Sequence, residues 1–252
     1  MAVLISTVLV LGLVVGSLVN RMVDRVPSGT SVFHPAARCP AGDHSNTNRH
    51  SVRVRGRQIP RGGGGSVRCP VVEVGTAALF VAMTLRLAAV DQLPALPACL
   101  YFVAVGVALT LIDIRCHRLP NAIVLPSYPV VLVLLGGAAV WQHDGCAWVR
   151  ALIGTVALFG AYFVLAAVHP AGMGSGDVKL AGVLGGLLAY WSPATLAVGT
   201  FTAFLLGAVA GAALLVGRRC SRKTAIPFGP YMVTGALFAI FAADPAAMSL
   251  RG

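Results

Sequence analysis

Eight apolar runs account for most of this sequence of 252 residues. They cover residues 2–19, 71–90, 96–112, 122–141, 147–168, 180–191, 193–216 and 229–243. A helix needs about 20 residues to cross a hydrocarbon core of about 30 Å, and most of the runs approach that length. In lipid every backbone polar group must be hydrogen-bonded within its segment, and no run shows the period-two alternation of barrel strands. The sequence therefore predicts an all-α, polytopic transmembrane helical bundle of about eight spans.

The composition excludes a soluble globular enzyme, because 57% of the residues are hydrophobic and only 11% are charged. The formal net charge of +11 could suggest a nucleic-acid partner. However, the basic residues lie almost wholly in short segments between the apolar runs. This placement favours cytoplasmic loops beside anionic lipid and no nucleic acid.

The same charges predict the orientation of the chain. The first run lacks a preceding basic residue and a small-x-small cleavage pattern, so we expect a retained span instead of a signal peptide. If the segment 20–70 is cytoplasmic, the loops that follow lie alternately outside and inside. Of the 19 Lys and Arg residues, only Arg86, Arg150 and Arg251 are then not cytoplasmic. The prediction is a multi-pass plasma-membrane protein with its N-terminus outside. The segment 20–70 itself is a basic, Gly/Arg-rich loop that cannot bury a core of its own.

Two acidic residues at membrane edges, Asp113 and Asp177, are candidates for function, because acidic side chains in or near the membrane are rare and energetically unfavourable. Two spans separate them, so both are expected at the cytoplasmic ends of helices. A carboxylate pair that shares one proton is what aspartic proteolysis requires. Gly174 and Gly176 would let an extended substrate backbone approach Asp177. The alternative is that these glycines cap a helix and each aspartate is a helix-end residue.

Five segments carry a resemblance to a known family. They are GMGSGDVKL (172–180), LIDIRCHRLPN (111–121), GSLVN (16–20), PVVE (70–73) and IPFGPY (226–231). In this order along the chain they resemble the motifs of the type IV prepilin peptidases, bacterial membrane aspartic proteases of the GxGD class. The resemblance covers nearly the whole chain, which indicates a single integral membrane peptidase domain over residues 1–252.

The resemblance implies cleavage of the short basic leader of type IV prepilins or pseudopilins at the cytoplasmic membrane face. Asp113 and Asp177 would be the catalytic pair. Lys179 would tune this pair or bind substrate, and Glu73 would orient the cleaved end of the substrate. The alternatives are a Lys179 that extends to the headgroups and a Glu73 that is favoured by the helix dipole.

The cytoplasmic loop departs from the family pattern. Many members carry two Cys-x-x-Cys pairs that bind zinc, and they also methylate the new N-terminus with S-adenosylmethionine. Here Cys39 is followed by Gly42 where the second cysteine would stand, the second pair is missing, and Cys69 occupies a position that is usually aromatic. We therefore expect no zinc site and no cofactor for proteolysis, and methylation is in question. Cys99 and Cys146, both expected outside, could form a disulfide.

Two other classes of protein fit the same sequence features. In a proton-coupled transporter the two aspartates would carry protons, although such acids usually lie near the bilayer midplane and often within an inverted repeat. A catalytically inactive assembly protein of a pilus or secretion machine would have the same fold.

Overall fold

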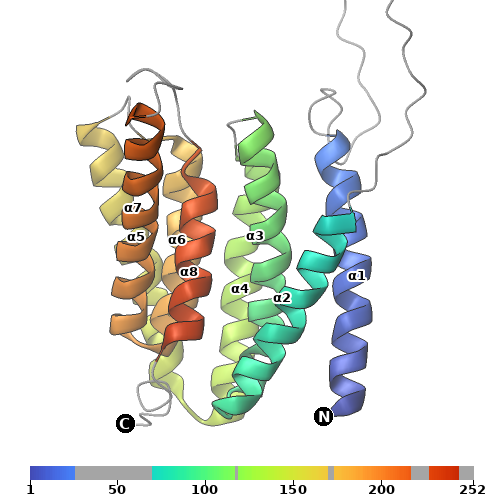
Figure 1. Ribbon diagram of the computed structural model, residues 1–252. Helices are drawn as coiled ribbons and strands as arrows, with labels where there is room; N and C mark the ends of the chain where they lie inside the picture. Colours follow the sequence, from blue (N-terminus) through green and yellow to red (C-terminus); the bar gives the residue numbers. More distant parts are fainter. Residues whose placement is uncertain (26–69, 117–118, 170–172, 217–226, 244–252) are drawn as a thin grey trace, which may run out of the picture.

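A computed structural model describes residues 1–25, 70–116, 119–169, 173–216 and 227–243 (Figure 1). The described residues form eight α-helices and one short 3-10 helix. They are α1 (Ala2–Arg25), α2 (Pro70–Ala89), η2 (Leu93–Ala95), α3 (Leu96–Cys116), α4 (Asn121–Gln142), α5 (Gly145–Val168), α6 (Ser175–Trp191), α7 (Pro193–Val216) and α8 (Gly229–Ala242). Each predicted apolar run thus corresponds to one helix.

Six of these helices, α1 to α5 and α7, are long and apolar enough to cross a membrane. The helices α6 and α8 are shorter, with 17 and 14 residues. The prediction of an all-α polytopic membrane bundle is confirmed. The helix α1 continues into the segment 20–70 as far as Arg25. The rest of that loop, residues 26–69, lies outside the described part of the chain.

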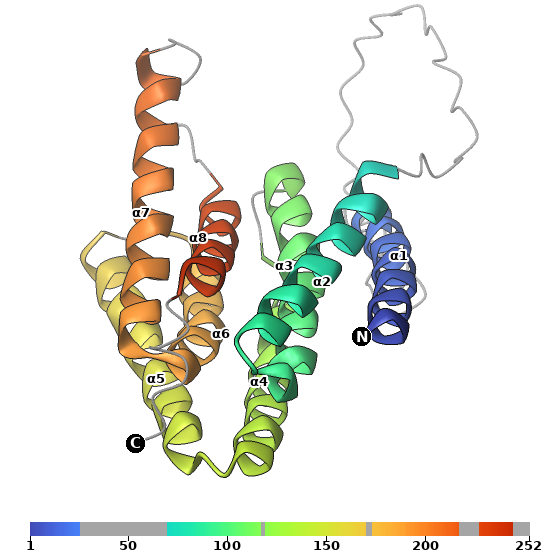
Figure 2. The ribbon, with the colours of Figure 1, turned by 60° about the horizontal axis from the view of Figure 1, so that its bottom comes forward.

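The helices pack as three antiparallel pairs, α1 with α2, α5 with α6 and α7 with α8, and α3 and α4 lie between these pairs (Figures 1 and 2). The helix α3 contacts α8, and α4 contacts α6. A continuous core includes the fully buried Leu109, Leu135, Leu187 and Ile240. This arrangement brings the end of α3 and the starts of α6 and α8 to one end of the bundle.

Glycines of α5 and α6 allow these two helices and α4 to pack in close contact. A Cβ atom on Gly185 would overlap the Gly154 carbonyl of α5, and one on Gly182 would overlap the Tyr128 hydroxyl of α4. Small residues that let backbones approach in this way are typical of membrane helix interfaces.

We expect Gly185→Ala to destabilise the protein by about 1–3 kcal/mol, because the added methyl meets backbone that cannot move aside. The measurement is the thermal unfolding midpoint in detergent. Gly160→Ala on α5 is the control, since nothing lies within 4 Å of its added Cβ and alanine favours a helix. Equal midpoints for the two variants would contradict this explanation of the interface.

Two of the three arginines that the sequence placed away from the cytoplasm bind protein groups at the end of the bundle opposite the two aspartates. Arg86 donates hydrogen bonds to the carbonyls of Ile240 and Ala243 at the end of α8. Arg150 lies 3.6 Å from the Asp144 carboxylate. Protein contacts thus account for these two cations, and Arg251 lies outside the described residues.

The sequence allowed a disulfide between Cys99 and Cys146. Both are free thiols in the structure. Cys99 is buried in α3, whereas Cys146 is exposed at the start of α5. The possible disulfide is therefore not formed.

Candidate active site

Asp113 and Asp177 lie at the same end of the bundle, in the last turn of α3 and the first turn of α6. Their exposed fractions are 5% and 9%. Asp177 precedes the apolar stretch that begins at Leu180. Burial raises the pKa of Asp177, and the negative charge of Asp113 raises it further, so the two carboxyl groups interact. Helices that are separated by two spans in the sequence therefore present a coupled pair of acids.

Gly174 and Gly176 shape the backbone around Asp177 in different ways. Gly174 is the exposed N-cap of α6, and a backbone hydrogen bond involving Gly174 partly offsets the rise in the pKa of Asp177. A Cβ on Gly176 would lie 2.7 Å from the Cβ of Leu119. We expected both glycines to leave room for substrate, but the space beside Gly176 is occupied by Leu119 of the first aspartate motif.

Lys179 connects the two aspartate motifs. Its Nζ atom donates a hydrogen bond of 2.9 Å to Oδ1 of Asn121, the last residue of the first motif. Its carbonyl accepts a 2.6 Å hydrogen bond from the Tyr128 hydroxyl on α4. Lys179 thus holds the start of α6 against the start of α4, a contact that neither of the two sequence interpretations had included.

Gly229 is a site residue to which the sequence analysis gave no role. The backbone N–H of Gly229 donates a 3.0 Å hydrogen bond to Oδ2 of Asp113. Gly229 is the first residue of α8, and the positive end of a helix stabilises a carboxylate. A Cβ on Gly229 would lie 2.8 Å from the same oxygen, so only glycine leaves room for this contact. The resemblance of residues 226–231 to a family motif was the sequence signal for this residue, but it did not indicate that Gly229 contacts Asp113.

A row of aromatic rings holds the start of α8 in place. Phe228 lies 5.4 Å from Phe204 of α7, and Phe204 lies 5.4 Å from Tyr162 of α5, measured between ring centroids. Gly207 of α7 gives Phe228 room, because a Cβ there would lie 2.7 Å from the Phe228 ring. Tyr162 also lies within electrostatic range of Asp177. The rings therefore link the segment that carries Gly229 to the neighbourhood of the second aspartate.

Glu73, the remaining predicted site residue, lies in the first turn of α2 against α1. Among the residues that the structure describes, its Oε1 atom has no hydrogen-bond partner.

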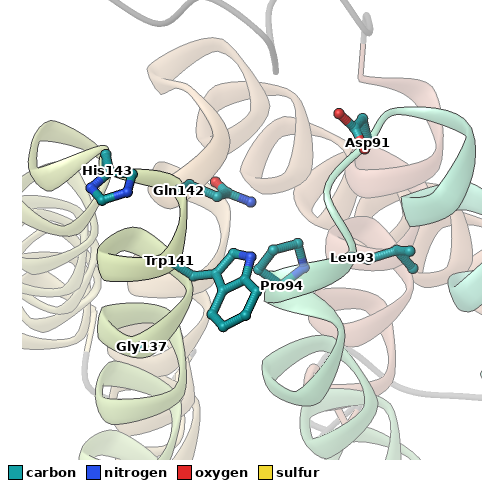
Figure 3. Close-up of a pocket in the computed structure, with 7 residues that line it drawn as sticks. All are labelled: Asp91, Leu93, Pro94, Gly137, Trp141, Gln142 and His143. Carbon is teal, nitrogen blue, oxygen red and sulfur yellow. The ribbon is translucent and has the colours of Figure 1, made fainter.

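A cavity of about 660 Å³ lies at the opposite end of the bundle (Figure 3). Its lining includes Asp91, Trp141 and His143, and the Trp141 ring points toward Pro94. Because both site aspartates are at the other end, this cavity is not part of the candidate site.

Within the described ranges, no group of three or more His, Cys, Asp or Glu residues is placed to hold a metal ion. The positions on which the zinc prediction depended, Cys39, Gly42 and Cys69, lie outside those ranges. That prediction therefore stays a prediction.

Comparison with known proteins gives two family matches that together cover most of the chain. Residues 10–87 match the bacterial peptidase A24 N-terminal domain, and residues 100–216 match the type IV leader peptidase family. No solved structure matches the chain.

Curated proteins with similar sequences are called prepilin leader peptidase/N-methyltransferase. The protein from Pseudomonas putida is 32% identical over 95% of this chain and 91% of its own length. The one from Bacillus subtilis is 28% identical over 96% and 95%, respectively. The one from Aeromonas hydrophila is 32% identical over 88% and 76%.

Proposed function

The chain belongs to the type IV leader peptidase family, and on that premise we propose that it is an aspartic endopeptidase that cleaves the short basic leader of type IV prepilins or pseudopilins. The observation that supports this proposal is the coupled pair of buried acids, Asp113 and Asp177, which two distant motifs contribute to one end of the bundle. The positive-inside distribution of Lys and Arg supports a location of this end at the cytoplasmic face.

In the mechanism we propose, the pair holds one proton. The Gly229 N–H favours the ionised form of Asp113, and the raised pKa of Asp177 favours its protonated form. Asp113 takes a proton from water while the water oxygen bonds to the scissile carbonyl carbon, and Asp177 donates a hydrogen bond to the carbonyl oxygen. The C–N bond then breaks and the leaving nitrogen takes up the proton. The products are a leader with a new carboxylate and a substrate with a new amine.

Proteolysis by two carboxyl groups needs no metal and no cofactor, and we propose that this holds here. The names of the relatives include N-methyltransferase, and S-adenosylmethionine is the methyl donor that the resemblance implies. Zinc would need the paired cysteines that the sequence lacks after Cys39. The mass of the cleaved product shows whether its new N-terminus is methylated, because methylation adds one methylene.

The experiment that tests the proposed function is cleavage of a co-expressed or purified prepilin by the wild-type protein in membranes. We expect a product that begins at the boundary between the basic leader and the hydrophobic helix, as determined by mass. Intact substrate under conditions where a known relative cleaves it would contradict the proposal and would favour the inactive assembly protein. Proton flux into vesicles without cleavage would favour the transporter.

We expect the cleavage rate to have a bell-shaped pH dependence. At low pH both acids are protonated and no base is left, whereas at high pH both are ionised and the hydrogen-bond donor is lost. Because burial and Asp113 raise the pKa of Asp177, the alkaline limb lies above the ordinary range for a carboxyl group. The measurement is kcat/KM against pH. A rate that is constant through the weakly acidic range and into the alkaline range would contradict the shared proton.

A further inference from the structure

The cavity of about 660 Å³ at the end of the bundle opposite the two aspartates has no role in the proposed reaction (Figure 3). It lies where α2 and α4 end and where η2 leads into α3. These three helices are long and apolar enough to span a membrane, so their ends lie near its surface. The cavity therefore opens where protein, water and lipid head groups meet.

The lining of the cavity changes from polar to apolar. Its outer edge is polar and is formed by Asp91, Gln142 and His143 (Figure 3). Its inner part is mainly apolar and is formed by Leu93, Pro94, Gly137 and Trp141. A cavity with this order of groups at a membrane surface fits an amphipathic molecule whose polar end faces the water.

A hydrogen bond joins the two sides of the cavity. The amide of Gln142 donates a 2.7 Å hydrogen bond to Oε1 of Gln92, the residue that follows Asp91. The Tyr190 hydroxyl donates to the Gln142 amide oxygen at 3.3 Å. Gln142 is thus bonded within the chain, and it holds the end of α4 against the end of α2. The cavity is therefore already formed before a ligand binds.

The outer edge of the cavity is electrostatically negative. Asp91 is exposed, and its carboxylate has no ion pair or hydrogen bond among the residues that the structure describes. The two described arginines at this end bind other groups, Arg86 the carbonyls at the end of α8 and Arg150 the carboxylate of Asp144. The edge therefore presents a carboxylate that no cation of the described chain neutralises.

Two helix ends add to this negative potential. The helices α2 and α4 both end at the cavity, each followed by a residue in the left-handed conformation, Asp91 and His143, with φ of 56°. A helix C-terminus carries partial negative charge, so an acidic residue beside it is unfavourable by itself and a cation there is stabilising. The edge of the cavity therefore favours a positively charged group.

The inner part of the cavity provides surfaces for a cation and for an acyl chain. Trp141 is 78% exposed, and the face of an indole ring attracts an ammonium group. Gly137 and Val133 precede Trp141 by one and two helical turns and are also exposed, so they continue the same face of α4 toward the membrane interior. Nothing lies within 4 Å of a Cβ added to Gly137. This face leads from the cavity into the hydrocarbon region.

We propose that the cavity binds a phospholipid whose head group carries a primary ammonium, such as phosphatidylethanolamine. The ammonium donates hydrogen bonds to the Asp91 carboxylate and lies against the Trp141 ring. The phosphate accepts a hydrogen bond from the His143 ring, and an acyl chain lies along Gly137. The bound lipid stabilises the bundle by joining the end of α2 to the end of α4. This site takes no part in proteolysis, so the inference is independent of the proposed function.

The test is lipid binding to the purified full-length protein in detergent, measured by native mass spectrometry. We expect phosphatidylethanolamine to bind roughly tenfold more tightly than phosphatidylglycerol, because only its ammonium supplies a charge-assisted hydrogen bond to Asp91. Asp91→Asn removes the charge, nearly keeps the size of the side chain and tolerates the left-handed backbone. In this variant the two lipids should bind with nearly equal affinity.

A second variant, Gly137→Leu, tests the position of the acyl chain. The new side chain would occupy the cavity without meeting protein atoms at its Cβ, so it should weaken the binding of phosphatidylethanolamine by about tenfold. Gly160→Leu on α5 is the matched control, because nothing lies within 4 Å of its added Cβ either and Gly160 does not line the cavity. It should bind the lipid as the wild type does. Phosphatidylethanolamine should also raise the unfolding midpoint of the wild type more than that of Gly137→Leu.

Equal affinities of the wild type for the two lipids would overturn the inference. Unchanged binding in Gly137→Leu would overturn it as well, and Asp91→Asn gives an independent comparison if the leucine variant does not fold. Glycerophosphoethanolamine has the same head group without acyl chains, and it should bind at least about tenfold more weakly than the lipid, because no apolar surface of a chain is buried. Equal binding of this compound would assign the cavity to a soluble amine and would overturn the lipid site.

Discussion

Asp113→Asn and Asp177→Asn should each reduce leader cleavage by roughly a thousandfold or more, because a dyad with one carboxyl group cannot both activate water and polarise the carbonyl. The amide is nearly the same size as the carboxyl group, and its oxygen can still accept the hydrogen bond from Gly229 at position 113. We therefore expect normal insertion and an unfolding midpoint close to that of the wild type. The measurement is product mass in a cleavage assay with purified protein in vesicles.

Asp91→Asn is the matched control for these two variants. Asp91 lies at the opposite end of the bundle, and its backbone φ of 56° is one that asparagine tolerates well. The control removes a negative charge from the protein without touching the candidate site, so it should cleave at the wild-type rate. Retained cleavage in either site variant would refute the dyad, and equal loss in the control would indicate a general effect of charge.

Gly229→Ala should reduce cleavage by about a hundredfold even though it changes neither aspartate. The new Cβ would lie 2.8 Å from Oδ2 of Asp113, so either the carboxylate or the start of α8 must move. The 3.0 Å hydrogen bond that favours the ionised form of Asp113 is then lost or distorted. A displacement of about 1 Å at a reacting group can lower the rate by about this factor. The loss should appear in kcat, because the substrate-binding groups are unchanged.

Gly145→Ala is the control for this prediction, because Gly145 is also the first residue of a helix, and nothing lies within 4 Å of its added Cβ. It should cleave normally and unfold at the wild-type temperature or slightly above. The pH profile gives a further check, since weaker stabilisation of the Asp113 carboxylate should move the acidic limb of the bell upward. A Gly229→Ala protein with wild-type kcat would show that the contact with Asp113 has no catalytic consequence.

The sequence by itself determined the class of fold and the two aspartates. Apolar runs near the length of a bilayer leave the backbone no alternative to helices, so all eight elements could be predicted, with errors of a few residues at their ends. The apolar run of α1 is interrupted by Asn20 and Arg21, whereas its helical hydrogen bonds continue to Arg25. The rarity of acids at membrane edges singled out Asp113 and Asp177 without knowledge of their separation.

Only the tertiary structure decided which groups surround those aspartates. Helix packing in a bundle depends on the shapes of many side chains at once, and contacts between residues more than a hundred positions apart leave no local pattern. The bond from Gly229 to Asp113 joins residues 116 positions apart. Gly176 shows the same limit, since its contact is Leu119 of a different motif. The sequence thus determined which residues carry the chemistry, and the packing of α1, α2, α3, α6 and α8 determined how they are held.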